Sequence, residues 1–141
     1  MKQFISLLPI NIFAFFEFLI ALPQAIKISI ENDEVKYIKV VCKDNCLLLK
    51  ISSLLTKTSI AGLTAGSFVF IKESYRDNQK ILKHEQVHIK QEIKSSILFP
   101  FIYLYYYVKI KITKSGDPYR DNPFEKEAYG YGKKITSTTE S

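Results

Sequence analysis

Residues 78–95 constrain the fold most strongly, because they carry a clear helical pattern and hold both histidines of the 141-residue chain. At about 100° per residue, the side chains of His84, His88 and Gln91 fall on one narrow stripe of this helix. Beside it lies an apolar stripe that we expect to face the core, made of Leu82, Ile89 and Ile93. The opposite side is expected to face water and holds Lys83, Lys90 and Lys94. The histidines therefore flank the buried side of the predicted helix.

The segment ahead of this helix changes to a period of two, which is typical of β-strands. β-Branched residues alternate in Ile26–Ile30 and Val35–Val41, and the run Leu47–Ile51 follows a "KDN" turn. These three segments predict an antiparallel meander. A fourth strand is predicted over residues 67–72, after a stretch that contains glycines, whereas residues 52–59 fit either a short helix or a loop.

Two further helices are predicted downstream of the histidines. Pro100 suits the first turn of a helix over Pro100–Val108. The apolar segment 97–108 is too short to span a membrane, so we expect it to supply core. The segment "NPFEKEAYGYG" begins with Asn122 as a cap and Pro123 at the first helical position. Together the elements predict an α+β fold, in which a small antiparallel sheet packs against the histidine helix and a C-terminal helix that carries glutamates.

Residues 4–23 form an apolar N-terminal stretch with three interpretations. Lys2 and the apolar run fit a signal peptide, although Glu17 interrupts the run and no small-residue cleavage site follows. The stretch also just reaches the length of a membrane anchor, or it forms a helix that packs on the domain or lies in a membrane interface. We expect the protein to be either cytoplasmic or associated with a membrane through residues 4–23. The chain divides into a hydrophobic helix in residues 1–24, a single domain in 25–134 and a frayed tail in 135–141.

The net charge of +6 is carried mostly by lysines that are spread along the whole chain. This distribution is more typical of a solvated surface than of a nucleic-acid footprint, so we expect no nucleic-acid partner. An anionic membrane surface is the better partner for the charge, given the two apolar segments. Cys42 and Cys46 alone are a weak metal signal, because a tetrahedral site needs two further ligands. Two free, partly buried thiols are the simpler interpretation.

The pair His84 and His88 carries the clearest chemistry. Histidines at positions i and i+4 of a helix stand about 5–6 Å apart at Cβ, so both imidazoles can reach one ion. Glu85 directly follows the first histidine and can act as a general base toward water bound at that ion. The pattern His-Glu-x-x-His therefore indicates a zinc site. A catalytic zinc needs a third protein ligand, which here must be a carboxylate or a thiolate, because the chain has no third histidine.

Glutamates on the predicted C-terminal helix are the main candidates for this third ligand. Glu125 and Glu127 are nearly equal by spacing, while Asp117 and Asp121 lie in the preceding loop. Glu125 also has a purely local interpretation, because a glutamate at the third helical position can bond to the amide of the cap residue. Ala128 would allow this helix to approach the histidine helix closely. Spacing alone leaves the choice of ligand open.

The stretch "LKHEQVHIKQ" followed by "YRDNPFEKEAY" resembles small zincin-like proteins of bacteria and phages. Those proteins pair His-Glu-x-x-His-x-x-Gln with a later Asn-Pro-Phe-Glu-x-Glu-Ala segment, and the resemblance extends over residues 60–130. More broadly, the chain is similar to gluzincin metallopeptidases, whose third ligand is the first glutamate of a Glu-x-x-Ala-Asp pattern. The resemblance implies Glu125 as that ligand, with Ala128 in the alanine place. Tyr129 stands where those proteins have an aspartate, so other groups must orient the histidines.

The resemblance implies a zinc-dependent metallopeptidase that acts on a peptide or protein substrate. In that function His84, His88 and Glu125 hold Zn²⁺, and Glu85 takes a proton from the zinc-bound water. The alternative is a membrane-associated binding module that holds zinc but is catalytically weak or inactive.

Two further features would serve a peptidase. A donor must stabilise the oxyanion, and the candidates are Tyr119, Arg120 and Tyr129. Strand 67–72, if it is a sheet edge near the metal, could hold a peptide by strand addition.

Overall fold

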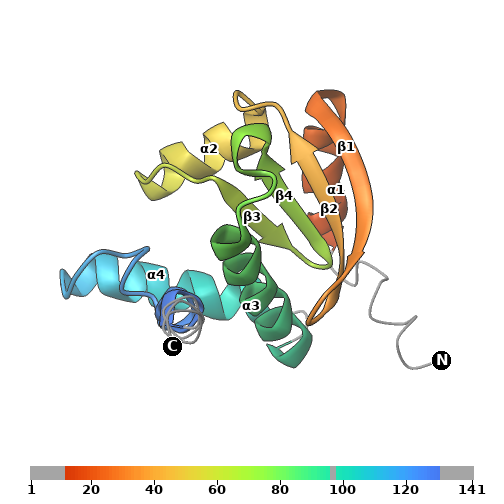
Figure 1. Cartoon of the computed structure of the whole chain (residues 1–141). Coiled ribbons are helices and arrows are strands. Elements are labelled where there is room, and N and C mark those ends of the chain that lie inside the picture. Colours follow the sequence, from red (N-terminus) through yellow and green to blue (C-terminus); the bar gives the residue numbers. More distant parts are fainter. Residues whose placement is uncertain (1–11, 96–97, 131–141) are drawn as a thin grey trace, which may run out of the picture.

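The structure is a computed structural model that describes residues 12–95 and 98–130 of the chain (Figure 1). In chain order its main elements are helix α1 (Ile12–Ala21), strands β1 (Ala25–Asn32) and β2 (Lys36–Cys42), helix α2 (Leu47–Thr56), strands β3 (Gly62–Ala65) and β4 (Phe68–Lys72), and helices α3 (Gln79–Ser95) and α4 (Phe99–Thr113). Short 3-10 turns, η2 (Leu22–Gln24) and η3 (Glu73–Tyr75), follow α1 and β4. Residues 123–130 form one more helical segment. The predicted α+β class is confirmed.

The four strands form one mixed sheet in the order β1-β2-β4-β3. The pair β1–β2 is antiparallel, with Ile28 opposite Val40. The pair β3–β4 is also antiparallel, but β2 and β4 run parallel, with Val40 opposite Phe70. The prediction of an antiparallel sheet is therefore wrong for its central pair.

The difference begins at Leu47–Ile51, where the predicted third strand is wrong because these residues start helix α2. Leu48 and Leu49 are buried, while the exposed apolar residues of α2 recur at helical spacing. Leucine is a good helix former, and a run as short as "LLLKI" does not separate the two periods. Because α2 returns the chain before the β3–β4 hairpin begins, β4 enters the sheet parallel to β2.

The hairpin β3–β4 turns at Gly66, whose positive φ of 58° suits a residue without a side chain. A Cβ atom at this position would stand 3.1 Å from the Cβ atom of Ala14, so the turn packs closely on α1. The predicted strand over residues 67–72 is confirmed as β4, but it lies between β2 and β3. The edge of the sheet on this side is β3, which the sequence prediction missed. A peptide added to this edge would therefore pair with β3 and not, as expected, with strand 67–72.

Helices cover both faces of the sheet, because side chains of β2 and β4 alternate between two core clusters. The first cluster lies under α1 and α2 and includes Val40, Leu49, Phe68 and Phe70. The second lies under α3 and includes Val41, Val69, Ile71, Leu82 and Ile89. The result is three layers, with α1 and α2 on one side of the sheet and α3 on the other (Figure 1). Cys42 and Cys46 are free thiols and are fully buried in the first cluster.

Helix α3 confirms the predicted histidine helix. Its first turn is capped by Asn78, whose Oδ1 accepts a hydrogen bond from the amide of Ile81 at 3.2 Å. Leu82 and Ile89 are buried against the sheet as predicted. Ile93 is 58% exposed, so the prediction of a continuous apolar stripe is wrong near the C-terminal end of α3.

The lysine face of α3 is more than a solvated surface. Lys83 forms an ion pair with Asp33, and Lys90 forms one with Glu34. Both acidic residues lie in the turn between β1 and β2, at the far end of the hairpin from α2. The lysines therefore also fix the position of α3 against this turn.

Three helices carry apolar faces that are exposed to solvent. At helical spacing, α1 exposes Phe15, Phe16, Leu19 and Ile20, α2 exposes Leu47, Ile51, Leu54 and Leu55, and α4 exposes Phe101, Leu104, Tyr105, Val108 and Ile112. The prediction that residues 97–108 supply core is therefore wrong for most of this segment. Helix α4 has Pro100 in its first turn as predicted, but it continues to Thr113. None of the helices in the described ranges is long and apolar enough to cross a bilayer.

Helix α1 corresponds to the second half of the predicted hydrophobic N-terminal helix. Its Ala14 and Ala21 are buried, and the ring of Phe18 stacks on Phe68 with centroids 4.9 Å apart. These contacts favour a packed helix for this part of the segment. Residues 4–11 and the tail expected over 135–141 lie outside the described residues, so those expectations stay predictions.

Candidate metal centre

Helix α3 and the helical segment 123–130 bring three potential metal ligands together. The ligand atoms of His84, His88 and Glu125 all lie within 4.8 Å of one another. The two Nε2 atoms are 3.2 Å apart, and the Glu125 oxygens stand 3.2 Å from Nε2 of His84 and 3.4 Å from Nε2 of His88. The exposed fractions of the three side chains are only 12%, 9% and 4%, in the same order. This group could hold a metal ion.

The geometry favours Glu125 over Glu127 as the third ligand. Asn122 caps the helical segment, because its side-chain Oδ1 accepts a hydrogen bond from the backbone amide of Phe124. The backbone amide of Asn122 donates a hydrogen bond to the carbonyl of Tyr119 at 3.2 Å. Because the cap amide already has a partner, the local interpretation of Glu125 as a capping-box residue does not hold. The carboxylate of Glu127 instead accepts a hydrogen bond from Nε2 of Gln91 at 2.8 Å, apart from the histidine pair.

Two polar side chains hold the potential ligands in place. Oε1 of Gln91 lies 2.8 Å from Nδ1 of His88, and the amide group of Gln91 is fixed because its Nε2 donates to the carbonyl of Phe124. Since an amide oxygen only accepts hydrogen bonds, Nδ1 of His88 carries the proton. Its Nε2 is then free to face His84 and Glu125. The hydroxyl of Tyr103, on α4, donates a hydrogen bond to Oε1 of Glu125 at 2.9 Å.

The electrostatics of His88 and Glu125 favour a proton or another cation between the two side chains. Burial lowers the pKa of His88, but the hydrogen bond to Glu125 and the carboxylate charge outweigh it and raise the pKa to about 9. Burial also tends to raise the pKa of Glu125, yet hydrogen bonds and charge from the two histidines hold it at about 2. If His88 were neutral, its Nε2 lone pair would face the carboxylate oxygens directly. Either a proton or a metal ion must therefore lie between them.

Glu85 is buried next to this group. The hydroxyl of Thr64, on β3, donates a hydrogen bond to its Oε2 at 2.8 Å. Gly62, on the same strand, makes room for the carboxylate, because a Cβ atom there would stand 3.1 Å from Oε1 of Glu85. Burial raises the pKa of Glu85, while the charges of the histidines and the bond from Thr64 oppose this rise.

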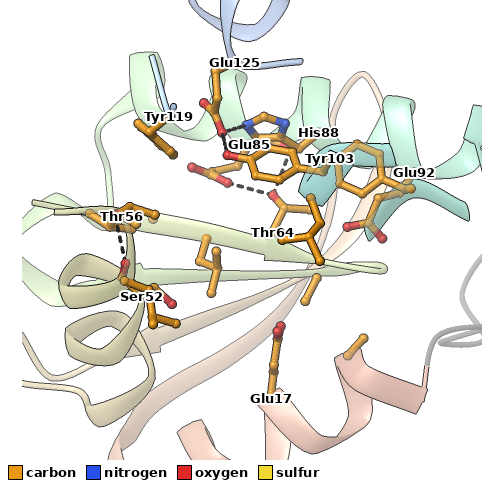
Figure 2. A pocket seen from close by; sticks show the side chains of 18 residues that line it. Glu17, Ser52, Thr56, Thr64, Glu85, His88, Glu92, Tyr103, Tyr119 and Glu125 are labelled. Atoms are coloured by element: carbon orange, nitrogen blue, oxygen red, sulfur yellow. Dashed lines mark hydrogen bonds and ion pairs between the residues drawn. The ribbon is translucent and has the colours of Figure 1, made fainter. Parts of the chain in front are cut away.

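Two cavities meet at the histidine group. The first has a volume of about 480 Å³ and is lined by His88 and Glu125 (Figure 2). The second has a volume of about 340 Å³ and is lined by His84. Glu85 and Tyr119 line both cavities, and β3 lines the first along its whole length. A chain that passed from one cavity to the other would therefore run alongside β3 and pass Glu85.

Tyr119 is the best placed of the three expected oxyanion donors, because it lies between the two cavities. Burial and the charge of Glu125 raise its pKa, so its hydroxyl keeps its proton at neutral pH. The ring of Tyr129 contacts His84, with centroids 4.5 Å apart, and lines only the second cavity. Arg120 is exposed and lines neither cavity, so the structure does not bring it to the site.

The sequence analysis missed three residues of this site. Thr64 donates to Glu85 and Tyr103 donates to Glu125, each from a segment far away in the chain, and no local pattern marks them. Gly62 had a weak signal, because it belongs to the glycine-containing stretch ahead of the predicted strand. That stretch forms strand β3, but the sequence analysis predicted a strand only after it, so the contact of Gly62 with Glu85 was not expected.

No family model matches this chain, and no curated protein or solved structure matches it either. The kind of site is therefore defined by geometry alone. It is a nearly buried His-His-Glu group that could hold a metal ion, with a buried glutamate beside it. The likeness to zincin-like proteins stays a resemblance that two sequence motifs carry.

Proposed function

We propose that this protein is a zinc-dependent metallopeptidase, in which His84, His88 and Glu125 hold the ion and Glu85 is the general base. The observation that carries the proposal is the convergence of three ligand atoms within 4.8 Å, beside a buried glutamate that lines two cavities. Two imidazoles and one carboxylate are a donor set typical of catalytic zinc, which keeps one position open. A structural zinc site usually has four protein ligands, and the group in the described ranges has three.

The residues around the group would divide the chemistry among them. A zinc ion held there would polarise the scissile carbonyl and lower the pKa of a water molecule to about 7. Glu85 accepts the proton of the attacking water and passes it to the leaving amine. The bond from Thr64 fixes Oε2 of Glu85, which leaves Oε1 for the water. Tyr119 is the proposed donor to the oxyanion, because its hydroxyl keeps its proton and it lies between the cavities.

The open edge of β3 supports an extended peptide as the substrate. Within the described sheet, β3 pairs only with β4, so its other edge is available to hydrogen-bond a peptide backbone. All four residues of β3 line the first cavity, and Thr64 connects this strand to Glu85. A peptide on this edge would therefore lie next to the proposed base.

The variant Glu85→Gln tests the proposal, because it keeps the size of the side chain and removes the base. We expect it to retain zinc and to lose hydrolysis of a peptide library by about 10²–10⁴-fold. Glu73→Gln is the matched control, since Glu73 is exposed and lines neither cavity. Hydrolysis that persists in Glu85→Gln, or a wild-type protein that binds no zinc, would contradict the proposal.

We propose in addition that the protein works at an anionic membrane surface. The exposed apolar faces of α1, α2 and α4 support this location, since interfacial helices bury such faces among lipid headgroups and acyl chains. Lys109, Lys111 and Lys114 stand at the C-terminal end of α4, and the whole chain carries a charge of +6. The same faces support the second candidate function, a zinc-binding membrane module with weak or no hydrolysis. Measured hydrolysis by the wild-type protein separates the two candidates.

A further inference from the structure

The first cavity has an acidic lining, and no lysine or arginine in that lining balances its glutamates. Its lining includes four glutamates and, apart from His88, no basic side chain among the described residues; the glutamates are Glu17, Glu85, Glu92 and Glu125. The chain as a whole has 20 lysines and arginines against 14 aspartates and glutamates. The acidic lining of the cavity therefore contrasts with the positive net charge of the chain as a whole.

Two of these glutamates, Glu17 and Glu92, belong to neither the potential ligands nor the base. Figure 2 shows their carboxylates directed into the cavity, Glu17 from α1 and Glu92 from α3. Oε2 of Glu92 accepts a hydrogen bond from the amide of Gly66 at 2.7 Å. Oε2 of Glu17 is buried and has no hydrogen-bond partner among the described residues. The cavity thus contains a carboxylate oxygen that a ligand could satisfy.

The surroundings of both carboxyl groups disfavour their ionised form. Burial raises the pKa of Glu17 to about 7, and burial together with the charge of Glu17 raises the pKa of Glu92 to about 7. A desolvated carboxylate without a partner is costly, and a second carboxylate nearby adds repulsion. A cation placed between the two side chains would relieve both effects.

The remaining wall of the cavity is apolar, with contributions from Ala14, Leu63, Phe99 and Leu104. Its volume of about 480 Å³ is sufficient for a long side chain. A simple metal cation would satisfy the carboxylates but would leave this apolar wall without contacts. A group with an aliphatic stem and a cationic end satisfies both parts, as the side chains of lysine and arginine do.

We propose that the first cavity is a specificity subsite for a lysine or arginine side chain of a peptide, recognised by Glu17 and Glu92. This inference rests on the proposed peptidase function and specifies its substrate class. The peptide backbone lies along the edge of β3, and the aliphatic part of the basic side chain contacts Leu63 and Leu104. The cationic end contacts the carboxylates of Glu17 and Glu92, which line the same cavity.

The test compares two capped pentapeptides that differ only in a central lysine or norleucine, with binding to Glu85→Gln measured by isothermal titration calorimetry. A charge-assisted contact predicts that the lysine peptide binds about 10-fold tighter or more. Adding Glu17→Gln or Glu92→Gln should remove most of this preference, whereas adding Glu73→Gln should leave it unchanged. Both glutamine substitutions keep the shape of the side chain and relieve desolvation, so folding is expected to persist and is checked by circular dichroism.

Equal affinity for the two peptides, or a preference that survives both substitutions, would overturn the proposal. If 1,5-diaminopentane binds as tightly as the lysine peptide, the cavity is a site for a free amine and the subsite is likewise rejected. Failure of the subsite can be told apart from failure of the peptidase function. Cleavage without preference for basic residues keeps the peptidase and rejects the subsite, while lysine-selective binding without wild-type cleavage keeps the subsite and rejects the peptidase.

Discussion

The hydroxyl of Thr64, on edge strand β3, donates a hydrogen bond of 2.8 Å to Oε2 of Glu85 on helix α3. The two residues are 21 positions apart in the chain, and the bond joins the sheet edge to the side chain that we propose as the base. The hydrogen bond from Thr64 favours the ionised form of the Glu85 carboxylate and limits its rotation. It thereby opposes burial, which raises the pKa of Glu85.

We expect Thr64→Val to reduce hydrolysis while zinc is retained. Valine has nearly the shape of threonine but donates no hydrogen bond, so the Glu85 carboxylate would lose its fixed orientation and its support for the charged form. Loss of a hydrogen bond to a charged group predicts a decrease in kcat/KM of about 10-fold or more. Thr113→Val, at the exposed end of α4, is the control. Equal rates for the two variants would show that Thr64 does not position the base.

Gly62→Ala should have a similar effect for a steric reason. The added methyl group would lie 3.1 Å from Oε1 and 3.2 Å from Cγ of Glu85, so the carboxylate must shift by a few tenths of an ångström. Displacement of a catalytic group on this scale costs about 10-fold or more in rate, and the change would leave the proposed zinc ligands untouched. Gly130→Ala is the matched control, because a Cβ atom there would meet nothing within 4 Å. Wild-type kinetics for Gly62→Ala would contradict the close packing described for Glu85.

The two motifs that form the site could be found from the sequence because each is local. The helical period of residues 78–95 places His84 and His88 on one side of a helix whatever the rest of the chain does. Asn122 and Pro123 mark the start of the second motif in the same way. The choice between Glu125 and Glu127 could not be made by spacing, because it depends on how two helices are rotated against each other.

The sheet was predicted less well, for a different physical reason. The strands β1, β2 and β4 are rich in β-branched and aromatic residues and were recognised. The run Leu47–Ile51 is too short to separate a helical period from a strand period, so its helical state is decided by packing on the sheet. The four-residue strand β3 is too short to show a period. These two errors changed the strand order and direction, and with them the identity of the sheet edge.

The acidic pair in the first cavity predicts a pH dependence of stability. The pKa of Glu17 is about 7 in the folded protein and about 4.3 in an unfolded chain. Since the folded pKa is the higher one, its contribution to stability is complete below pH ~4.3 and is lost as the pH rises to about 7. We expect Glu17→Gln to gain stability relative to the wild type between pH 5 and pH 8, as measured by urea unfolding. A constant difference between the two proteins over this range would contradict the burial of this carboxyl.

The exposed face of α4 predicts binding to anionic vesicles. We expect the protein to float with phosphatidylserine-containing vesicles and to be released at least in part by high salt or carbonate, because its helices lie at the surface. Phe101→Ser combined with Ile112→Ser should weaken binding by about 10-fold or more, since two large apolar contacts are lost. The control is Ile30→Ser on β1, which is 66% exposed but outside the helical faces. Complete retention until detergent is added would instead indicate a transmembrane anchor.

Zinc content is the measurement that tests the central claim most directly. The purified protein should carry about one zinc ion per chain, and His88→Ala should lose it, because two remaining ligands hold zinc poorly. Glu125→Ala should also lose zinc, while Glu127→Ala, a change on the same helix outside the ligand group, should retain it. If Glu125→Ala keeps a full complement of zinc, or if Glu127→Ala is the variant that loses it, the assignment of His84, His88 and Glu125 as the metal centre is wrong.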